Sequence, residues 1–369
     1  MSLRLIIAGG GTGGHVFPGI ALAEAFLSLC PDGEVSFVGT AGGLEAGAVP
    51  ARGFRIDFVP AGQVRGKGAR GVLGLLKMAM GLLAADRVVA RRPRPDFVIG
   101  VGGYASVPVA LSATLRGVPL FLQEQNAVPG RANRLLGRTA RRVYAGFREA
   151  AAYFPPGRVE VTGNPVRREI VAAAGSRRRD LPEAPFSVFA FGGSQGARAI
   201  NDLVVEMARR VKEEGREMRF ILQTGRSGFE TVEKTIREVG LPVEPFPFTD
   251  RMAEEFDRCH AVLMRAGALS IAEAALFGKP CVLIPYPFAA DRHQEKNAEE
   301  FCAAGAGVFL RQEEATAERV LAALDAFAAD PARRTAAGEA AARFSRPDAA
   351  LEIVRSALAQ LGKREASRV

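Results

Sequence analysis

A strand that enters a helix through a glycine turn opens the chain and occurs again near its middle. The first copy is RLIIAGGGTGGHVFPGIALAEAF, residues 4–26, and the second is SVFAFGGSQGARAINDLVVEMA, residues 187–208. A short apolar strand joined to a helix by glycines is the first βα unit of a Rossmann-like domain. The repeat therefore predicts two such domains in one chain.

The rest of the chain alternates in the same way. Apolar strand candidates recur at 3–8, 35–38, 96–100, 120–123, 219–223, 261–264 and 281–285, and helical stretches separate many of them. A length of 369 residues suffices for two cores. We expect an α/β fold of two Rossmann-like domains facing a cleft. The polar segment 163–185 is the expected linker, and the alanine-rich run 317–359 predicts closing helices.

The first glycine turn raises the question of a dinucleotide site. Gly9, Gly11 and Gly14 have the G-x-G-x-x-G spacing, but no acid follows the second strand until Glu45. Because an acid near that strand end normally holds the ribose, a nicotinamide cofactor is disfavoured. A third glycine turn, GVGGYASVP at 100–108, favours a pyrophosphate bound by backbone amides at helix starts.

Charge and cysteine usage limit the partners. All of the formal net charge of +9 falls within residues 1–163, which directs this half toward an anion. No nucleic-acid motif is visible and aromatic residues are 7%, so a phosphorylated substrate or an anionic lipid surface is preferred to nucleic acid. The four cysteines are scattered, which is typical of buried thiols in a reducing compartment, and no secretory signal opens the sequence.

An apolar segment at 71–95 is rimmed by cations. It is too short to span a bilayer, because Lys77 and Asp86 interrupt it. We expect it to dock on an anionic leaflet through Leu75, Leu76, Met80, Leu83 and Arg91; a fully buried helix is the alternative. A second basic stripe at helical spacing is formed by Arg131, Arg134, Arg138 and Arg141, for which a solvated face is the alternative.

Seven motifs in order carry a family resemblance. They are GGTGGHVFPG, GGYASVP, QEQN, GNPVR, GGSQGAR, MRAGALSIAE and DRHQEKNA, and they cover nearly the whole chain. Together they resemble the MurG family, the UDP-N-acetylglucosamine transferases of peptidoglycan synthesis. The resemblance implies a glycosyltransferase-B fold, with an acceptor and membrane domain at 1–163 plus the returning helix at 343–369, and a UDP-GlcNAc domain at 164–342.

The resemblance also implies an activity. It is the inverting transfer of GlcNAc from UDP-GlcNAc to the 4-hydroxyl of MurNAc in undecaprenyl-pyrophosphoryl-MurNAc-pentapeptide, at the cytoplasmic face of the cell membrane. No cofactor is expected, and the absence of a D-x-D motif gives no reason to expect a metal. The implied partners are the two substrates, the anionic inner leaflet, and cell-wall or division proteins.

Donor and acceptor residues follow from the matching motifs. Glu273 is expected to hold the ribose hydroxyls, although an early-helix glutamate complementing the dipole is the alternative. The other donor residues implied are Thr12, Gly13, Gly14, Asn126, Arg167, Ser194, Thr249, Met252, Gly267, Ala268, Leu269, His293 and Gln294. The acceptor residues implied are Gly11, Gly103, Tyr104, Ser106 and Gln125.

The reaction needs a general base for the acceptor hydroxyl. His15 follows the first glycine turn and has a suitable near-neutral pKa in general, so it is favoured, with Glu124 as the alternative. Other functions remain open on the sequence alone. They are another UDP-sugar enzyme of this fold, such as a glycolipid glycosyltransferase or a UDP-GlcNAc 2-epimerase, and a non-catalytic nucleotide-sugar binder.

Overall fold

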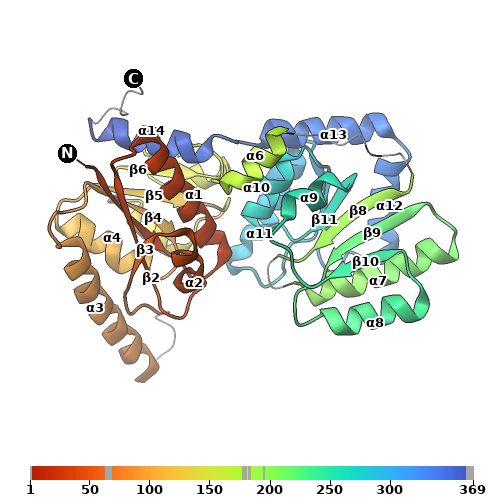
Figure 1. Cartoon of the computed structure of the whole chain (residues 1–369), viewed down its shortest axis with the longest axis horizontal. Coiled ribbons are helices and arrows are strands. Elements are labelled where there is room, and N and C mark those ends of the chain that lie inside the picture. The colour runs from red at the N-terminus through yellow and green to blue at the C-terminus, as the bar shows by residue number, and fades with distance from the viewer. Residues whose placement is uncertain (1, 63–68, 177–180, 182–183, 194–195, 363–369) are drawn as a thin grey trace. The chain divides into compact units, whose positions relative to one another are not determined.

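The computed structural model describes residues 2–62, 69–176, 181, 184–193 and 196–362, with the backbone alone for 69–77 and 176. The chain divides into two compact units. The first is Met1–Arg168 with Pro347–Val369, and the second is Glu169–Arg346. Each unit contains one parallel sheet with helices packed on it, and Figure 1 labels most of the elements.

The sheet of the first unit has seven strands in the order β3-β2-β1-β4-β5-β6-β7. Every neighbouring pair is parallel. The strand order reverses between β1 and β4, and this reversal is where open α/β sheets bind ligands at the carboxyl ends of their strands. The strands are β1 (Arg4–Gly9), β2 (Glu34–Gly39), β3 (Arg55–Phe58), β4 (Phe97–Gly102), β5 (Leu120–Glu124), β6 (Arg142–Ala145) and β7 (Val159–Val161).

Helices bury both faces of this sheet. On one face α1 and α14 close a core that includes Phe26, Phe97 and Ile353, while on the other α3 and α4 close a core that includes Ala85 and Val109. The last helix thus lies beside α1 in the first unit (Figure 1). The helices are α1 (Gly13–Leu29), α2 (Glu45–Ala48), α3 (Ala69–Val89), α4 (Ser106–Leu115), α5 (Arg131–Leu136) and α14 (Ala349–Gln360), with 3-10 turns η1 (Pro50–Arg52) and η2 (Glu149–Tyr153).

The second unit repeats the plan with six strands in the order β10-β9-β8-β11-β12-β13, which reverses between β8 and β11. The strands are β8 (Phe186–Phe191), β9 (Met218–Gln223), β10 (Val243–Phe246), β11 (Ala261–Met264), β12 (Cys281–Leu283) and β13 (Gly307–Phe309). The helices are α6 (Arg168–Ser176), α7 (Arg198–Glu213), α8 (Phe229–Val239), α9 (Met252–Asp257), α10 (Ala268–Leu276), α11 (His293–Ala303), α12 (Ala317–Ala328) and α13 (Pro331–Phe344), with the 3-10 turn η3 (Ala290–Arg292).

The predicted fold class is confirmed: the chain has two Rossmann-like parallel sheets. The pattern did not identify β3, β6, β7, β10 and β13, which have only three or four residues each and mostly lie near sheet edges. A short, half-buried strand has too few residues to produce a clear period. The expected linker 163–185 is wrong in one respect, because α6 forms within it.

Candidate active site

Two glycine turns meet where the strand order of the first sheet reverses. The amide of Gly10 donates to the carbonyl oxygen of Gly102 at 3.3 Å. A Cβ placed on Gly103 would lie 2.4 Å from the carbonyl oxygen of Gly10, so only glycine permits this approach. The contact brings the predicted residue Gly103 beside the first glycine turn. The predicted residues Gly11, Thr12, Gly13 and Gly14 lie there already, at the start of α1. A helix start of this kind binds anions.

His15 lies in the first turn of α1 with its tautomer set by the loop. Its Nδ1 is 3.1 Å from the carbonyl oxygen of Gly10 and 3.4 Å from Oγ1 of Thr12. Because a carbonyl oxygen only accepts, Nδ1 carries the hydrogen and Nε2 is the accepting nitrogen of the neutral ring. A Cβ on Gly102 would lie 3.0 Å from Nε2, so this nitrogen faces the β4–α4 turn. The arrangement suits a general base.

Glu124, the alternative base, is 2% exposed at the end of β5. Its Oε1 accepts from the amide and the side chain of Asn126 at 3.0 and 3.4 Å. Its Oε2 accepts from Nδ2 of Asn133 at 2.8 Å and from the amide of Gly130 at 3.3 Å. Burial raises the pKa of Glu124, and these hydrogen bonds offset it only in part. Each oxygen already accepts two hydrogen bonds, so the carboxylate shapes the 124–133 turn.

The acceptor residues expected around this turn differ in accessibility. Gln125 is 3% exposed and donates to the carbonyl oxygen of Val101 at 2.8 Å, and Ser106 is fully buried and donates to Gly103 at 2.7 Å. Tyr104 is 49% exposed. Gln125 and Ser106 therefore hold the turns in place, whereas Tyr104 is open to a ligand.

Arg167, expected at the donor, lies in the first unit. Its guanidinium carbon is 4.9 Å from the centre of the Phe17 ring. A Cβ on Gly13 would lie 3.0 Å from the same ring, so Phe17 packs beside the glycine turn. A cation over an aromatic face is a favourable contact. This places the Arg167 charge near the start of α1, and its contact with the donor stays a prediction.

In the second unit, α10 begins where the strand order reverses. Gly267 caps the helix and Ala268 and Leu269 form its first turn. Asn297, which is fully buried on α11, donates from Nδ2 to the carbonyl oxygen of Ala266 at 3.1 Å and fixes the β11–α10 turn. Glu273 is the sixth residue of α10, beyond the first turn, so it is no early-helix partner of the dipole.

Gln223 was not identified from the sequence. It ends β9, is 2% exposed, and donates from Nε2 to the carbonyl oxygen of Gly193 at 3.2 Å. Its Oε1 accepts from the amide of Thr249 at 3.1 Å. The side chain thus joins the glycine turn after β8 to the Thr249 segment after β10. The sequence did contain a signal for Gln223, because a polar glutamine ends an apolar strand at the carboxyl edge of the sheet, where ligands bind.

Three further residues that the resemblance implies at the UDP-GlcNAc site belong to the same unit. The amide of Thr249, one of the implied donor residues, donates to Gln223, and Met252 is 8% exposed at the start of α9. Ser194 lies outside the described residues.

The turn before α11 is strained. Asp291 and Arg292 have φ of 50° and 54°, a left-handed conformation that costs a non-glycine residue about 1–2 kcal/mol. Nδ1 of His293 bonds to the carbonyl oxygen of Ala290 at 2.8 Å, and Oε1 of Gln294 accepts from the amide of Tyr286 at 2.9 Å. Because Oε1 of Gln294 accepts this bond, its NH₂ group points away from the Tyr286 amide. The left-handed backbone of Asp291 and Arg292 is strain of a kind that is common at functional sites.

The described part of α3 has one exposed and one buried face rather than being buried on every side. Met80 and Leu83 are 57% and 63% exposed, whereas Ala85 is fully buried. A Cβ on Gly81 would lie 2.2 Å from the carbonyl oxygen of Pro60, which fixes the packed face. Leu75 and Leu76 belong to α3, but their side chains lie outside the described residues. Within those residues, no helix has both the length and the apolar character needed to cross a membrane.

The structure bears on two predictions about basic residues: the membrane contact of Arg91, which stays a prediction, and the second basic stripe. Nη1 of Arg91 is 2.7 Å from both carboxylate oxygens of Asp57, so its charge is paired within the protein. The second basic stripe is wrong as a helical face, since α5 ends at Leu136. Arg138 and Arg141 lie beyond that helix, and Arg141 donates to the carbonyl oxygen of Gln360 at 3.1 Å.

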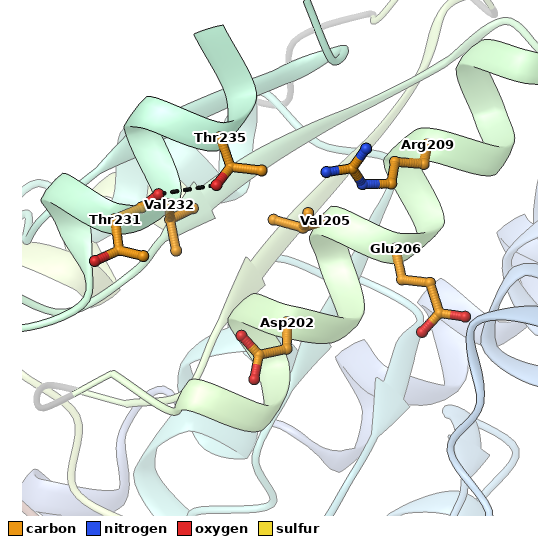
Figure 2. A pocket seen from close by; sticks show the side chains of 7 residues that line it. All are labelled: Asp202, Val205, Glu206, Arg209, Thr231, Val232 and Thr235. Carbon is orange, nitrogen blue, oxygen red and sulfur yellow. Dashed lines mark hydrogen bonds between the residues drawn. The ribbon is translucent and has the colours of Figure 1, made fainter. Parts of the chain in front are cut away.

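In the parts of the chain that the structure describes, no three His, Cys, Asp or Glu residues are placed to hold a metal ion. One pocket of about 280 Å³ lies between α7 and α8 (Figure 2). Its lining is Asp202, Val205, Glu206, Arg209, Thr231, Val232 and Thr235, none of which is a predicted site residue.

Comparisons with known proteins agree with the two-domain plan. The glycosyltransferase family 28 N-terminal domain matches residues 5–145, and the family 28 C-terminal domain matches residues 187–353. A UDP-GlcNAc 2-epimerase from Neisseria meningitidis, solved with UDP-GlcNAc, has a TM-score of 0.67 over 97% of this chain and its full length. At 12% identity this likeness shows the fold alone.

Two other proteins are more similar. The crystal structure of Acinetobacter baumannii MurG matches with a TM-score of 0.78 and 27% identity over 96% of this chain and 98% of that one. The UDP-N-acetylglucosamine–N-acetylmuramyl-(pentapeptide) pyrophosphoryl-undecaprenol N-acetylglucosamine transferase of Geobacter sulfurreducens is 42% identical over 98% of this chain and its own full length. On this evidence the chain belongs to the MurG family of N-acetylglucosamine transferases.

Proposed function

We propose that the chain is an inverting glycosyltransferase that uses UDP-GlcNAc as donor. It moves GlcNAc to the 4-hydroxyl of MurNAc in undecaprenyl-pyrophosphoryl-MurNAc-pentapeptide. The observation that carries this proposal is the 42% identity over 98% of the chain to a relative whose name states these substrates. That match includes both units, so it supports a chain with both an acceptor-binding and a donor-binding unit.

The reaction is a direct displacement. Nε2 of His15 takes the proton of the 4-hydroxyl, and the oxygen attacks the anomeric carbon of GlcNAc on the face opposite the nucleotide. The bond from that carbon to the β-phosphate oxygen breaks, and UDP leaves with the electron pair. One displacement inverts the α-linked donor to a β-linked product. The hydrogen bond from Nδ1 of His15 to Gly10 supports this role because it leaves Nε2 as the basic nitrogen.

The two units divide the substrates. The first holds the lipid-linked pyrophosphate at its two adjoining glycine turns, which suits the net charge of +9 in residues 1–163. The second holds UDP at the start of α10 and at the glycine turn after β8, with Glu273 on the ribose. Helix starts and the Arg167 cation stabilise the charge that develops on the leaving UDP.

The lipid carrier requires the enzyme to work at a membrane surface. Met80 and Leu83 present an exposed apolar face on α3, and basic residues flank this helix in the sequence. Such a face binds anionic leaflets peripherally, with each nearby cation contributing about 1 kcal/mol. We therefore place the protein at the cytoplasmic face of the cell membrane, where cell-wall and division proteins are its further partners.

The test is UDP release by the purified full chain from UDP-GlcNAc, with and without a short-chain lipid-linked MurNAc-pentapeptide. Release that depends on the acceptor, with a β-1,4-linked disaccharide lipid as product, is the expected result. UDP release without acceptor would favour the epimerase or a hydrolase instead. Donor binding with no turnover, where a known transferase is active in the same assay, would identify a nucleotide-sugar binder and overturn the proposal.

A further inference from the structure

A buried carboxylate lies beneath the first glycine turn. Glu45 starts the short helix α2 and is 1% exposed. Its Oε1 accepts from the amide and the hydroxyl of Thr40, both at 2.8 Å. Its Oε2 accepts from the amide of Gly11 at 2.6 Å, across 34 residues of sequence. The shortest of these contacts therefore goes to the glycine turn.

Glycines surround this carboxylate on three sides. A Cβ on Gly10 would lie 2.2 Å from its carboxyl carbon, one on Gly43 would lie 2.1 Å from Oε2, and one on Gly39 would lie 2.5 Å from Cγ. No real Cβ tolerates such distances, so these positions admit only glycine while Glu45 keeps its place. These three glycines make room for a side chain of the protein itself, and no ligand is needed to explain them.

The peptide group that donates to Glu45 also accepts a hydrogen bond from His15. The N–H of Gly11 and the C=O of Gly10 belong to one peptide group, whose atoms lie in a plane. The carboxylate of Glu45 accepts from the N–H of this group, and the C=O accepts from Nδ1 of His15 at 3.1 Å. The sequence of contacts is therefore carboxylate, peptide group, imidazole. Hydrogen bonds in series polarise one another, so an anion at one end strengthens acceptance at the other.

Glu45 is charged in this arrangement. Burial by itself raises the pKa of Glu45, but the hydrogen bonds from Gly11 and Thr40 outweigh it and hold the pKa below its ordinary value. The preceding peptide group, Gly9–Gly10, is held by the neighbouring turn, because the N–H of Gly10 donates to the carbonyl oxygen of Gly102 at 3.3 Å. An ionised carboxylate on a fixed peptide is a stable source of negative potential.

We propose that Glu45 is a positioning residue for His15, acting through the Gly10–Gly11 peptide group. It holds the carbonyl of Gly10 against Nδ1, which orients the ring and makes Nε2 more basic toward the acceptor hydroxyl. A carboxylate bonded directly to a histidine performs this task in many hydrolases. Here the carboxylate performs it across one peptide group, from a residue outside the seven motifs of the family resemblance.

Several titratable or charged groups belong to the elements around the first glycine turn. The β2–α2 turn contributes Glu45, and the β4–α4 turn contributes Tyr104. The end of β5 contributes Glu124, whose oxygens face Asn126, Gly130 and Asn133. Arg167 lies over Phe17 of α1. Of these, Glu45 is the ionised group that shares a peptide group with the His15 contact.

The first experiment uses the full chain and the transfer assay, with Glu45→Gln, His15→Ala and the double variant. The glutamine can keep the Thr40 contacts, but its amide then faces the Gly11 N–H, donor against donor. We expect Glu45→Gln to lower kcat roughly 10- to 100-fold, by analogy with residues that orient the histidine ligands of metal sites. The acidic limb of its pH–rate profile should move to lower pH, because His15 loses a neighbouring negative charge.

The double variant separates positioning from general stability. With His15 absent, Glu45→Gln should cause no further loss of kcat, because its effect passes through that ring. Thr40→Val is the matched control: it removes the hydroxyl contact to Oε1 at 2.8 Å and leaves the Gly11 contact. It should leave the pH profile unchanged. KM for UDP-GlcNAc should be the same in Glu45→Gln as in the unaltered chain.

Gly43→Ala provides a second probe that keeps the carboxylate. Its methyl carbon would lie 2.1 Å from Oε2 and must push it off the Gly11 amide. The variant should therefore change kcat and the pH profile in the same direction as Glu45→Gln, which also covers the case in which Glu45→Gln fails to fold.

Each other outcome contradicts the inference in a distinguishable way. An equal loss from Glu45→Gln with and without His15, or an unmoved pH profile, would show that Glu45 only stabilises the fold. The inference rests on the proposed function. If the unaltered chain transfers GlcNAc but His15→Ala retains full activity, the base assignment fails and the inference with it. If the unaltered chain transfers nothing, the proposed function itself fails.

Discussion

Nδ1 of His15 lies 3.1 Å from the carbonyl oxygen of Gly10, a residue of the same glycine turn. This contact directs Nε2 toward Gly102, where a Cβ would come within 3.0 Å of it. The base, the turn that orients it and the neighbouring turn are thus one unit of structure. A change to the His15 side chain should therefore affect the reaction before it affects the fold.

His15→Ala should lower kcat roughly one hundred- to ten-thousandfold, the usual contribution of a general base. KM for UDP-GlcNAc should change little, because the ring acts on the acceptor. Steady-state kinetics with thermal unfolding as a control measures both. Gly102→Ala is the companion variant: its methyl group would press on the imidazole, so activity should fall although His15 is present. Full activity in His15→Ala would assign the base elsewhere.

Glu124→Gln should affect stability and activity together. Its NH₂ group would face either the donors of Asn126 or those of Asn133 and Gly130, and an unsatisfied buried group costs about 1–3 kcal/mol. Asn133→Ala, which removes one of these donors, should destabilise the first unit by a similar amount. Denaturant unfolding alongside kinetics makes the comparison. A Glu124→Gln variant with unchanged stability, a hundredfold lower kcat and no acidic limb would instead identify Glu124 as the base.

Glu295→Gln should weaken the donor site. Its carboxylate binds Arg292 at 2.7 Å and Arg311 at 2.6 Å and so clamps the strained turn that carries His293 and Gln294. Losing charged hydrogen bonds at a partly exposed site should raise KM for UDP-GlcNAc roughly three- to tenfold. KM for the lipid acceptor should stay constant, and Lys296→Gln on the same helix is the matched control. An equal rise in both KM values would argue against a donor-specific clamp.

The carboxylate of Glu295 should also make the stability of the protein depend on pH. Burial raises the pKa of Glu295, but the contacts with Arg311 and Arg292 outweigh it and hold the pKa below 4.5. A group whose pKa is lowered by folding adds stability above its unfolded pKa and loses it as pH falls through the folded one. The unaltered chain should therefore lose more stability below about pH 4.5 than Glu295→Gln does. Urea titrations at several pH values test this, and parallel curves would contradict it.

The exposed face of α3 should decide binding to anionic vesicles. Leu83→Ser should weaken cosedimentation with phosphatidylglycerol vesicles several-fold, since Leu83 is 63% exposed. Phe288→Ser is a control in the second unit, where an aromatic ring is 80% exposed. Arg87→Ala should weaken binding more than Arg91→Ala, because Asp57 neutralises Arg91. Equal effects of the two arginines would show that the Asp57 pair opens at the membrane.

Much of the fold could be predicted because its signals are local. An apolar run such as 120–123 marks a buried parallel strand, and a glycine turn marks the point where it enters a helix. The short strands β7 and β13 escaped prediction because three residues show no period. Helix α6 escaped because prolines and arginines around it resemble a linker.

Site residues could be proposed from the sequence where they lie within motifs, whereas contacts between distant segments could not. His15 and Gly267 stand in recognisable turns. Gln223 was missed because its two contacts, to Gly193 and Thr249, join segments that are neighbours only after β9 pairs with β8 and β10. Arg91 was taken as an available cation because nothing in the sequence places Asp57 next to it.

The sequence by itself determined the two βα repeats, the family and the residue types at each glycine turn, because these depend on local conformation and side-chain period. Only the tertiary structure decided which turns meet. The reversal of strand order between β1 and β4 brings Gly10 to Gly102, and the β2–α2 turn carries Glu45 beneath Gly11. Such contacts follow from strand order and helix packing, which no single segment encodes.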